Sequence, residues 1–172
     1  MTERLFIDTD IILDIVFKRE PFFSDSQNIL SLIERNYFSG FTSSLIIANC
    51  YYIINSTRDK KIALKTISKL RSILNILPFT DKEIGESLNS NIIDFEDGVQ
   101  YFIALNNNIN NFITRNISDY KDLDINVLTP KDFLNSVKRL LNDQSLYENS
   151  IKLAERINKE DGITQSIKIL GF

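Results

Sequence analysis

The chain has 172 residues and a formal net charge of −3, a length that closes one sizeable hydrophobic core and is too short for two comfortable domains. It contains no histidine, which excludes Ser-His-Asp and Cys-His catalysis and the usual zinc sites, and its five scattered glycines cannot form either glycine-rich nucleotide loop. No apolar run is long enough to span a bilayer and no signal-peptide pattern opens the chain, so we expect a cytoplasmic protein without membrane contact.

Short apolar strands alternate with helices from the beginning of the chain. The run at 5–7 predicts a buried strand that ends in an acidic turn at Asp8, and the spacing of the apolar residues after it predicts a helix. The apolar stretch at 44–56 favours a helix by its length, and its lone Cys50 is expected in the core. Up to residue 79 the sequence predicts strands at 5–7, 38–42 and 76–79, and helices at 10–18, from Ser24 or Asp25 onwards, at 44–56 and at 59–75.

The second half continues this alternation. The sequence predicts helices near Asp81, after a cap at Asp94 and at 133–141, strands at 111–114 and 126–129, and a helical extension at 143–172. Strands and helices in this order predict an α/β domain whose mainly parallel sheet is covered on both faces. Ligands of such sheets lie beyond the carboxyl ends of the strands.

Three polar turns are expected at that edge of the sheet, at 8–10, 94–97 and 114–119. Carboxylate and amide oxygens suit hard cations such as Mg²⁺ or Mn²⁺, and phosphodiester hydrolysis uses such an ion to activate water and to neutralise developing charge. Acids at helix starts are also favoured by capping and by the helix dipole without any metal. The spacing alone therefore leaves both a metal site and ordinary capping open.

Four segments, in chain order, resemble the motifs of the PIN-domain family, and most of all its bacterial toxin branch, the VapC-like ribonucleases. They lie at 5–14, 42–49, 94–101 and 114–120, within a resemblance that covers about residues 4–135. The resemblance implies a PIN-like three-layer α/β/α domain at 1–142, followed by the extension at 143–172. It also implies an Mg²⁺- or Mn²⁺-dependent endoribonuclease with an RNA substrate, an antitoxin partner and, as in many PIN domains, a homodimer.

The family's functional positions carry over residue by residue. Catalytic positions correspond to Asp8, Asp97 and Asp119, and the expected metal-binding set is Asp8, Asp97, Asp94, Glu96 and Asp119. The expected periphery of the site consists of Asp10, Ser43, Asn49, Arg115 and Asn116. Asn49 departs from the pattern, because many members have Glu there and a neutral amide holds a hard cation less strongly.

Several of these residues have a second interpretation. Ser43 also suits a helix cap, and Arg115 suits either a phosphate contact or a surface ion pair. Tyr101 and Tyr120 are candidates for stacking on a base, although core packing is favoured for both. The alternative to a ribonuclease is a PIN-fold binding or regulatory protein that has lost strong metal affinity, which Asn49 and the acidic balance would explain.

Overall fold

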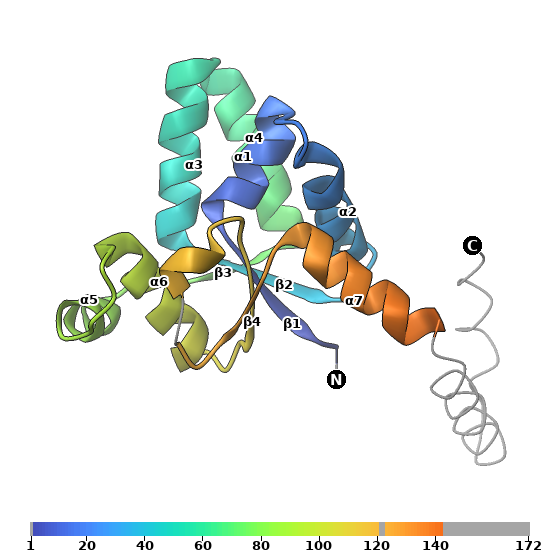
Figure 1. Ribbon diagram of the computed structural model, residues 1–172. Coiled ribbons are helices and arrows are strands. Elements are labelled where there is room, and N and C mark those ends of the chain that lie inside the picture. Colours follow the sequence, from blue (N-terminus) through green and yellow to red (C-terminus); the bar gives the residue numbers. More distant parts are fainter. Residues whose placement is uncertain (1, 121–122, 143–172) are drawn as a thin grey trace, which may run out of the picture. The chain divides into compact units, whose positions relative to one another are not determined.

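The computed structural model describes residues 2–120 and 123–142 (Figure 1). Contacts divide the chain into one compact unit at 1–134 and a second at 135–172, so the boundary falls inside the last described helix. The predicted extension at 143–172 lies outside the described residues, and the domain division at residue 142 stays a prediction. No helix in the described part of the chain is long and apolar enough to cross a membrane.

A five-stranded parallel sheet forms the centre of the first unit, in the order β3-β2-β1-β4-β5. Its strands are β1 (Arg4–Ile7), β2 (Ser39–Ser43), β3 (Asn75–Leu77), β4 (Asn111–Ile113) and β5 (Asn126–Leu128). The helices are α1 (Thr9–Phe17), α2 (Phe23–Glu34), α3 (Ser44–Thr57), α4 (Lys60–Ile73), α5 (Asp81–Leu88), α6 (Phe95–Asn106) and α7 (Pro130–Asn142), with a 3₁₀ turn, η1 (Ile117–Tyr120).

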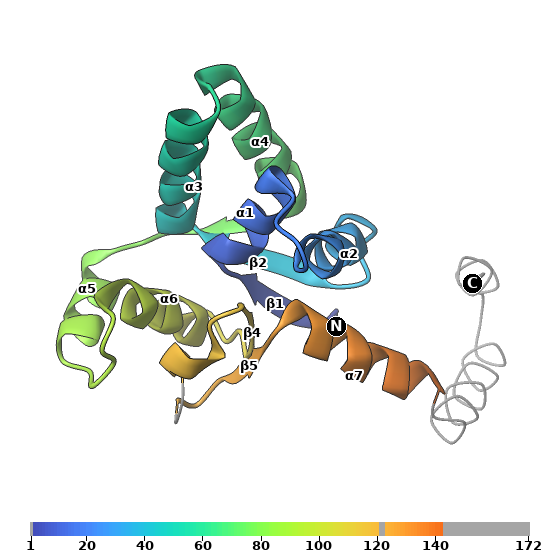
Figure 2. The same ribbon diagram turned by 45° about the horizontal axis from the view of Figure 1, so that its top comes forward.

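The order of the strands explains how the helices divide between the two faces. From β1 the chain moves outward to β2 and β3, then crosses back to β4 on the other side of β1. Because parallel crossovers are right-handed, the two directions place their helices on opposite faces. Helices α1–α4 cover one face, and α5 and α6 lie on the other (Figures 1 and 2). The predicted three-layer α/β/α fold is confirmed, and the direction reverses between β1 and β4, the place where such sheets bind ligands.

Two predicted boundaries are wrong. Helix α2 begins at Phe23, and neither Ser24 nor Asp25 caps it, because the chain already turns through hydrogen bonds from the Phe22 and Phe23 amides to the Arg19 carbonyl. Strand β3 begins at Asn75 rather than residue 76 and ends before Pro78, whose missing amide proton cannot continue a ladder. The other helices and strands lie within two or three residues of their predicted positions.

An aromatic stack connects the sheet to its functional edge. Phe6 of β1 is opposite Phe112 of β4, and their rings stack with centroids 4.9 Å apart. The Phe112 ring lies 4.6 Å from that of Tyr120, and all three side chains are buried. Burial of such a ring stabilises the fold by roughly 1.5–3 kcal/mol. The core therefore fixes Tyr120, whose hydroxyl reaches the acidic edge described below.

Cys50, which the sequence predicts to lie in the core, is buried.

Candidate active site

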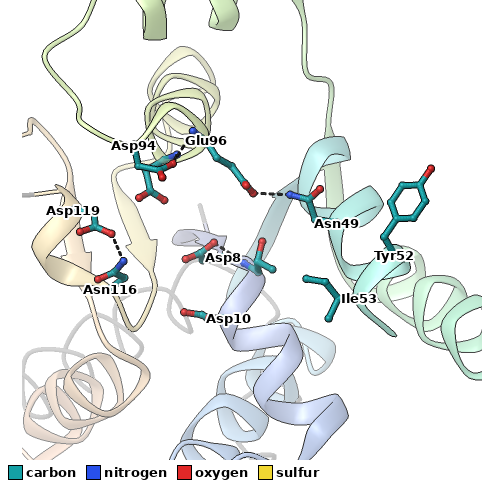
Figure 3. A pocket seen from close by; sticks show the side chains of 11 residues that line it. Asp8, Asp10, Asn49, Tyr52, Ile53, Asp94, Glu96, Asn116 and Asp119 are labelled. Atoms are coloured by element: carbon teal, nitrogen blue, oxygen red, sulfur yellow. Dashed lines mark hydrogen bonds between the residues drawn. The ribbon is translucent and has the colours of Figure 1, made fainter. Parts of the chain in front are cut away.

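A cavity of about 510 Å³ opens at the carboxyl edge of the sheet. It receives residues from the turn after β1, from α3, from the start of α6 and from the loop after β4 (Figure 3). The lining residues are Asp8, Thr9, Asp10, Asn49, Tyr52, Ile53, Asp94, Glu96, Asp97, Asn116 and Asp119. The three polar turns predicted from the sequence therefore do meet at one place.

Asp8 follows β1 directly and is the N-cap of α1. Its Oδ1 accepts a hydrogen bond from the Thr9 amide at 2.6 Å, and its Oδ2 accepts one from the Thr114 hydroxyl at 2.7 Å. Thr114 is itself fixed, because its Oγ1 accepts from the Asn116 amide at 3.0 Å. Burial raises the Asp8 pKa from 3.8 to about 6, the two hydrogen bonds counteract part of this shift, and nearby acids add to it.

Asp97 lies in the first turn of α6. Its Oδ1 accepts a hydrogen bond from the Tyr120 hydroxyl at 2.9 Å, which joins the acid to the aromatic stack of the core. Burial is the largest cause that raises the Asp97 pKa from 3.8 to about 7, and the charges of Asp8, Asp94 and Asp119 raise it further. The charge of Asp8 thus acts on Asp97, and none of the described residues that line the cavity is a lysine or arginine.

The start of α6 is held by two local features. Asp94 caps the helix, as predicted, by accepting hydrogen bonds from the amides of Glu96 at 2.8 Å and Asp97 at 3.2 Å. Gly98 allows α5 to approach this first turn, because a Cβ there would lie 2.4 Å from the Ser87 hydroxyl. That hydroxyl donates to the Phe95 carbonyl at 3.0 Å, so α5 and α6 fix the backbone that carries the acids.

Two further acids in the cavity are hydrogen-bonded to neutral amides. The Asn49 side chain of α3 donates to Glu96 Oε1 at 2.6 Å, and that of Asn116 donates to Asp119 Oδ2. Among the described residues, no three acids or thiols lie close enough together to form a ready group of metal ligands. The donor chemistry nevertheless fits a hard cation, because the cavity is lined by many carboxylate oxygens.

Ser43 is not part of this cavity, which corrects its predicted place at the site periphery. It is fully buried, its Oγ caps α3 by accepting from the Ile46 amide at 3.0 Å, and it donates to Gln100 Oε1 at 2.8 Å. The capping interpretation of Ser43 is the one that the structure supports. Its side chain connects the start of α3 to α6.

Arg115 also lies outside the cavity lining, and its ion-pair interpretation holds. Its guanidinium contacts Asp10 at 2.9 Å and the fully buried Asp14 at 3.4 Å, and it lies 4.6 Å above the Phe22 ring. Burial raises the pKa of Asp14, and Arg115 and Arg19 counteract that shift. Arg115 therefore anchors the loop after β4 to α1, beside the site.

We expect Arg115→Ala to lower the free energy of unfolding by about 2–4 kcal/mol, because the buried Asp14 then keeps the more distant Arg19, at 4.0 Å, and the Ser26 hydroxyl, at 3.3 Å, but loses its nearer guanidinium. Urea denaturation measures the change, with the exposed Arg71→Ala on α4 as the control. Combining Arg115→Ala with Asp14→Asn should recover part of the loss. Unchanged stability of Arg115→Ala would show that the arginine has no structural role.

One aromatic residue of the site, Tyr52, was not predicted from the sequence. Tyr101 and Tyr120 are only 7% and 2% exposed, so both are packed in the core as favoured, and Tyr120 additionally holds Asp97. Tyr52 of α3 lines the cavity and is 69% exposed. Its spacing of one helical turn from Asn49 was the available signal for a place beside the acids.

Comparison with known proteins agrees with this geometry. The PIN domain family model matches residues 4–118. Ribonuclease VapC1 of Aquifex aeolicus (strain VF5) is 31% identical over 137 residues, which cover 77% of this chain and 94% of that protein.

Solved structures share the fold. VapBC2 from Rickettsia felis, bound to a DNA fragment from its promoter, matches with a TM-score of 0.59 at 19% identity, over 73% of this chain and 98% of that chain. A toxin-antitoxin complex from Klebsiella pneumoniae matches with a TM-score of 0.56 at 17% identity, over 73% of this chain and 97% of that chain. From the family model and the identity to VapC1, the chain belongs to the PIN-domain family, among its VapC-like members.

Proposed function

We propose that this protein is a divalent-metal-dependent endoribonuclease that cuts RNA at the cavity beside β1 and β4. The observation that carries the proposal is the pairing of Asp8 with Asp97, two acids of raised pKa from separate elements, in a chain 31% identical to a ribonuclease. Carboxylates that repel each other in a cleft are typical of sites that hold a cation. The reaction is hydrolysis of a phosphodiester bond.

Mg²⁺ or Mn²⁺ would be held mainly by Asp8 and Asp97, with Asp94, Glu96 and Asp119 as further oxygen donors. When bound, the ion supplies the Lewis acidity that activates water and neutralises charge developing on the phosphate. The chain's own residues orient the acids: Thr114 holds Asp8 at 2.7 Å and Tyr120 holds Asp97 at 2.9 Å. Asp119 is the candidate for a third catalytic acid.

A second candidate function rests on Asn49. This neutral side chain lines the cavity and donates to Glu96 at 2.6 Å, in place of the Glu that many family members have there. A site with one carboxylate fewer binds a hard cation more weakly. The chain would then be a PIN-fold binding or regulatory protein rather than an efficient nuclease.

We also propose that the protein is the toxin of a toxin–antitoxin pair, so that its expected partners are RNA and an antitoxin protein. VapC-like relatives support this assignment, and one solved structure with the same fold is described as a toxin-antitoxin complex. A homodimer stays a prediction.

Incubating a mixed RNA pool with the purified protein separates the two functions. We expect cleavage with Mn²⁺ and none with EDTA, because without a cation the carboxylates of the cavity repel the negatively charged phosphate of the RNA. Calorimetry with Mn²⁺ on the same preparation supplies the second readout. Intact RNA together with negligible heat of Mn²⁺ binding would favour the binding protein.

A further inference from the structure

Tyr52 presents an exposed aromatic ring next to the acids. It lies on α3 one turn after Asn49, whose amide reaches across to Glu96, and Figure 3 shows both side chains on the same helix, with the Tyr52 ring at the outer rim of the cavity. Its ring contacts Tyr51 edge to face at a centroid distance of 5.7 Å and an angle of 73°. This contact orients the ring, yet Tyr52 remains 69% exposed.

The charges around Tyr52 determine what it can recognise. Six of the residues that line the cavity are acids, namely Asp8, Asp10, Asp94, Glu96, Asp97 and Asp119, and none of the described lining residues is lysine or arginine. Phosphate contacts by basic side chains, the usual source of nucleic-acid affinity, are therefore not provided by this lining. Inside this cavity, the contact that remains available to a nucleotide beyond the metal is one with its base, and aromatic stacking is the sequence-tolerant form of such a contact.

We propose that Tyr52 is the platform on which a base of single-stranded RNA stacks when the neighbouring phosphodiester lies at Asp8 and Asp97. This inference rests on the proposed ribonuclease function and adds the side chain that contacts a base of the substrate. A base held in a duplex is already stacked on its neighbours, so the platform selects unpaired nucleotides. Tyrosine suits this role because its large, rigid ring loses little conformational entropy on binding.

The first experiment measures binding of a fluorescent single-stranded oligoribonucleotide in the presence of Mn²⁺, using Asp97→Asn as the background to prevent turnover. Adding Tyr52→Ala should raise Kd by roughly 5- to 100-fold, the range found for loss of one stacked base. Tyr52→Phe keeps the ring and should bind like its parent, whereas Tyr52→Leu keeps apolar area without a flat ring and should bind weakly. Tyr37→Ala, at an exposed tyrosine outside the cavity lining, is the matched control and should change nothing.

The second experiment identifies the base. Abasic sites are placed one at a time along the oligonucleotide, and one position should reproduce the loss caused by Tyr52→Ala. At that position the two changes together should cost no more than either alone, because they remove the same contact. In the active protein Tyr52→Ala should raise KM with little change in kcat, as expected for loss of uniform binding.

Three results overturn the inference: equal Kd for Tyr52→Ala and its parent, additive effects at every abasic position, or a Kd loss that accompanies a shift from dimer to monomer in light scattering. The last would make Tyr52 a subunit contact. Failure of the proposed function itself looks different, because the wild-type protein would then leave RNA intact with Mn²⁺. Wild-type cleavage with an unchanged KM in Tyr52→Ala would reject the platform alone.

Discussion

Asp97→Asn should lower Mn²⁺-dependent RNA cleavage by roughly 100-fold or more and leave the fold intact. The substitution removes a charged oxygen ligand but retains a carbonyl oxygen that can accept the Tyr120 hydroxyl bond. Asp8→Asn should lower cleavage to a similar extent. Asp8→Asn should lower the stability of the fold more than Asp97→Asn does, because both Asp8 oxygens accept hydrogen bonds and an amide offers one acceptor only.

The exposed Asp124→Asn is the matched control and should cleave at the wild-type rate. Circular dichroism and thermal melting of the metal-free proteins accompany the rate measurements. Cleavage at the parent rate by Asp97→Asn would remove this acid from the site. A large loss of metal-free stability in Asp97→Asn would instead assign Asp97 a structural role.

Mn²⁺ affinity should fall by roughly 100- to 1000-fold between about pH 8 and about pH 5, because each acid must lose its proton before it binds the cation. The window follows from the raised pKa values, about 6 for Asp8 and about 7 for Asp97. Calorimetry in buffers of different ionisation enthalpy measures both the affinity and the protons released. In Asp97→Asn the dependence above about pH 6 should disappear.

The same raised pKa values make the stability of the metal-free protein fall as the pH rises, whereas the Mn²⁺ affinity rises with pH. Both folded pKa values lie above the 3.8 of an exposed aspartate, so the folded chain binds protons more tightly than the unfolded chain. The contribution of these two acids is therefore favourable at low pH and is lost as the pH rises through about 6 and 7. A Mn²⁺ affinity that stays constant between about pH 8 and about pH 5 would show that Asp8 and Asp97 are not the metal ligands.

Much of the fold and the gathering of acids could be predicted because both depend on local patterns. Apolar runs such as 5–7 and 111–114 identify buried parallel strands, and parallel strands place their polar ends at one edge. Asp94 was predicted as a cap because its place before a helical stripe is a local signal, and its bonds to Glu96 and Asp97 agree. The edge of the sheet then brings Asp8, Asp97 and Asp119 to one cavity.

The remaining features depend on contacts between distant residues. Nothing near Ser43 in the sequence shows that its hydroxyl reaches Gln100, 57 positions away. Arg115 could not be assigned to Asp14 without knowing that α1 and the loop after β4 are neighbours. Tyr52 could not be separated from Tyr101 and Tyr120 by composition, because exposure decides which ring is available and exposure is set by the tertiary fold.

The central claim is that RNA cleavage depends on a divalent cation held by Asp8 and Asp97, and titration of the wild-type protein with Mn²⁺ tests it most directly. Binding is followed by calorimetry and RNA cleavage is followed in the same buffer, from EDTA to saturating Mn²⁺. We predict no cleavage in EDTA and a rate that rises in parallel with the bound fraction of Mn²⁺. Undiminished cleavage in EDTA, or full Mn²⁺ occupancy with the RNA pool intact, would contradict the claim.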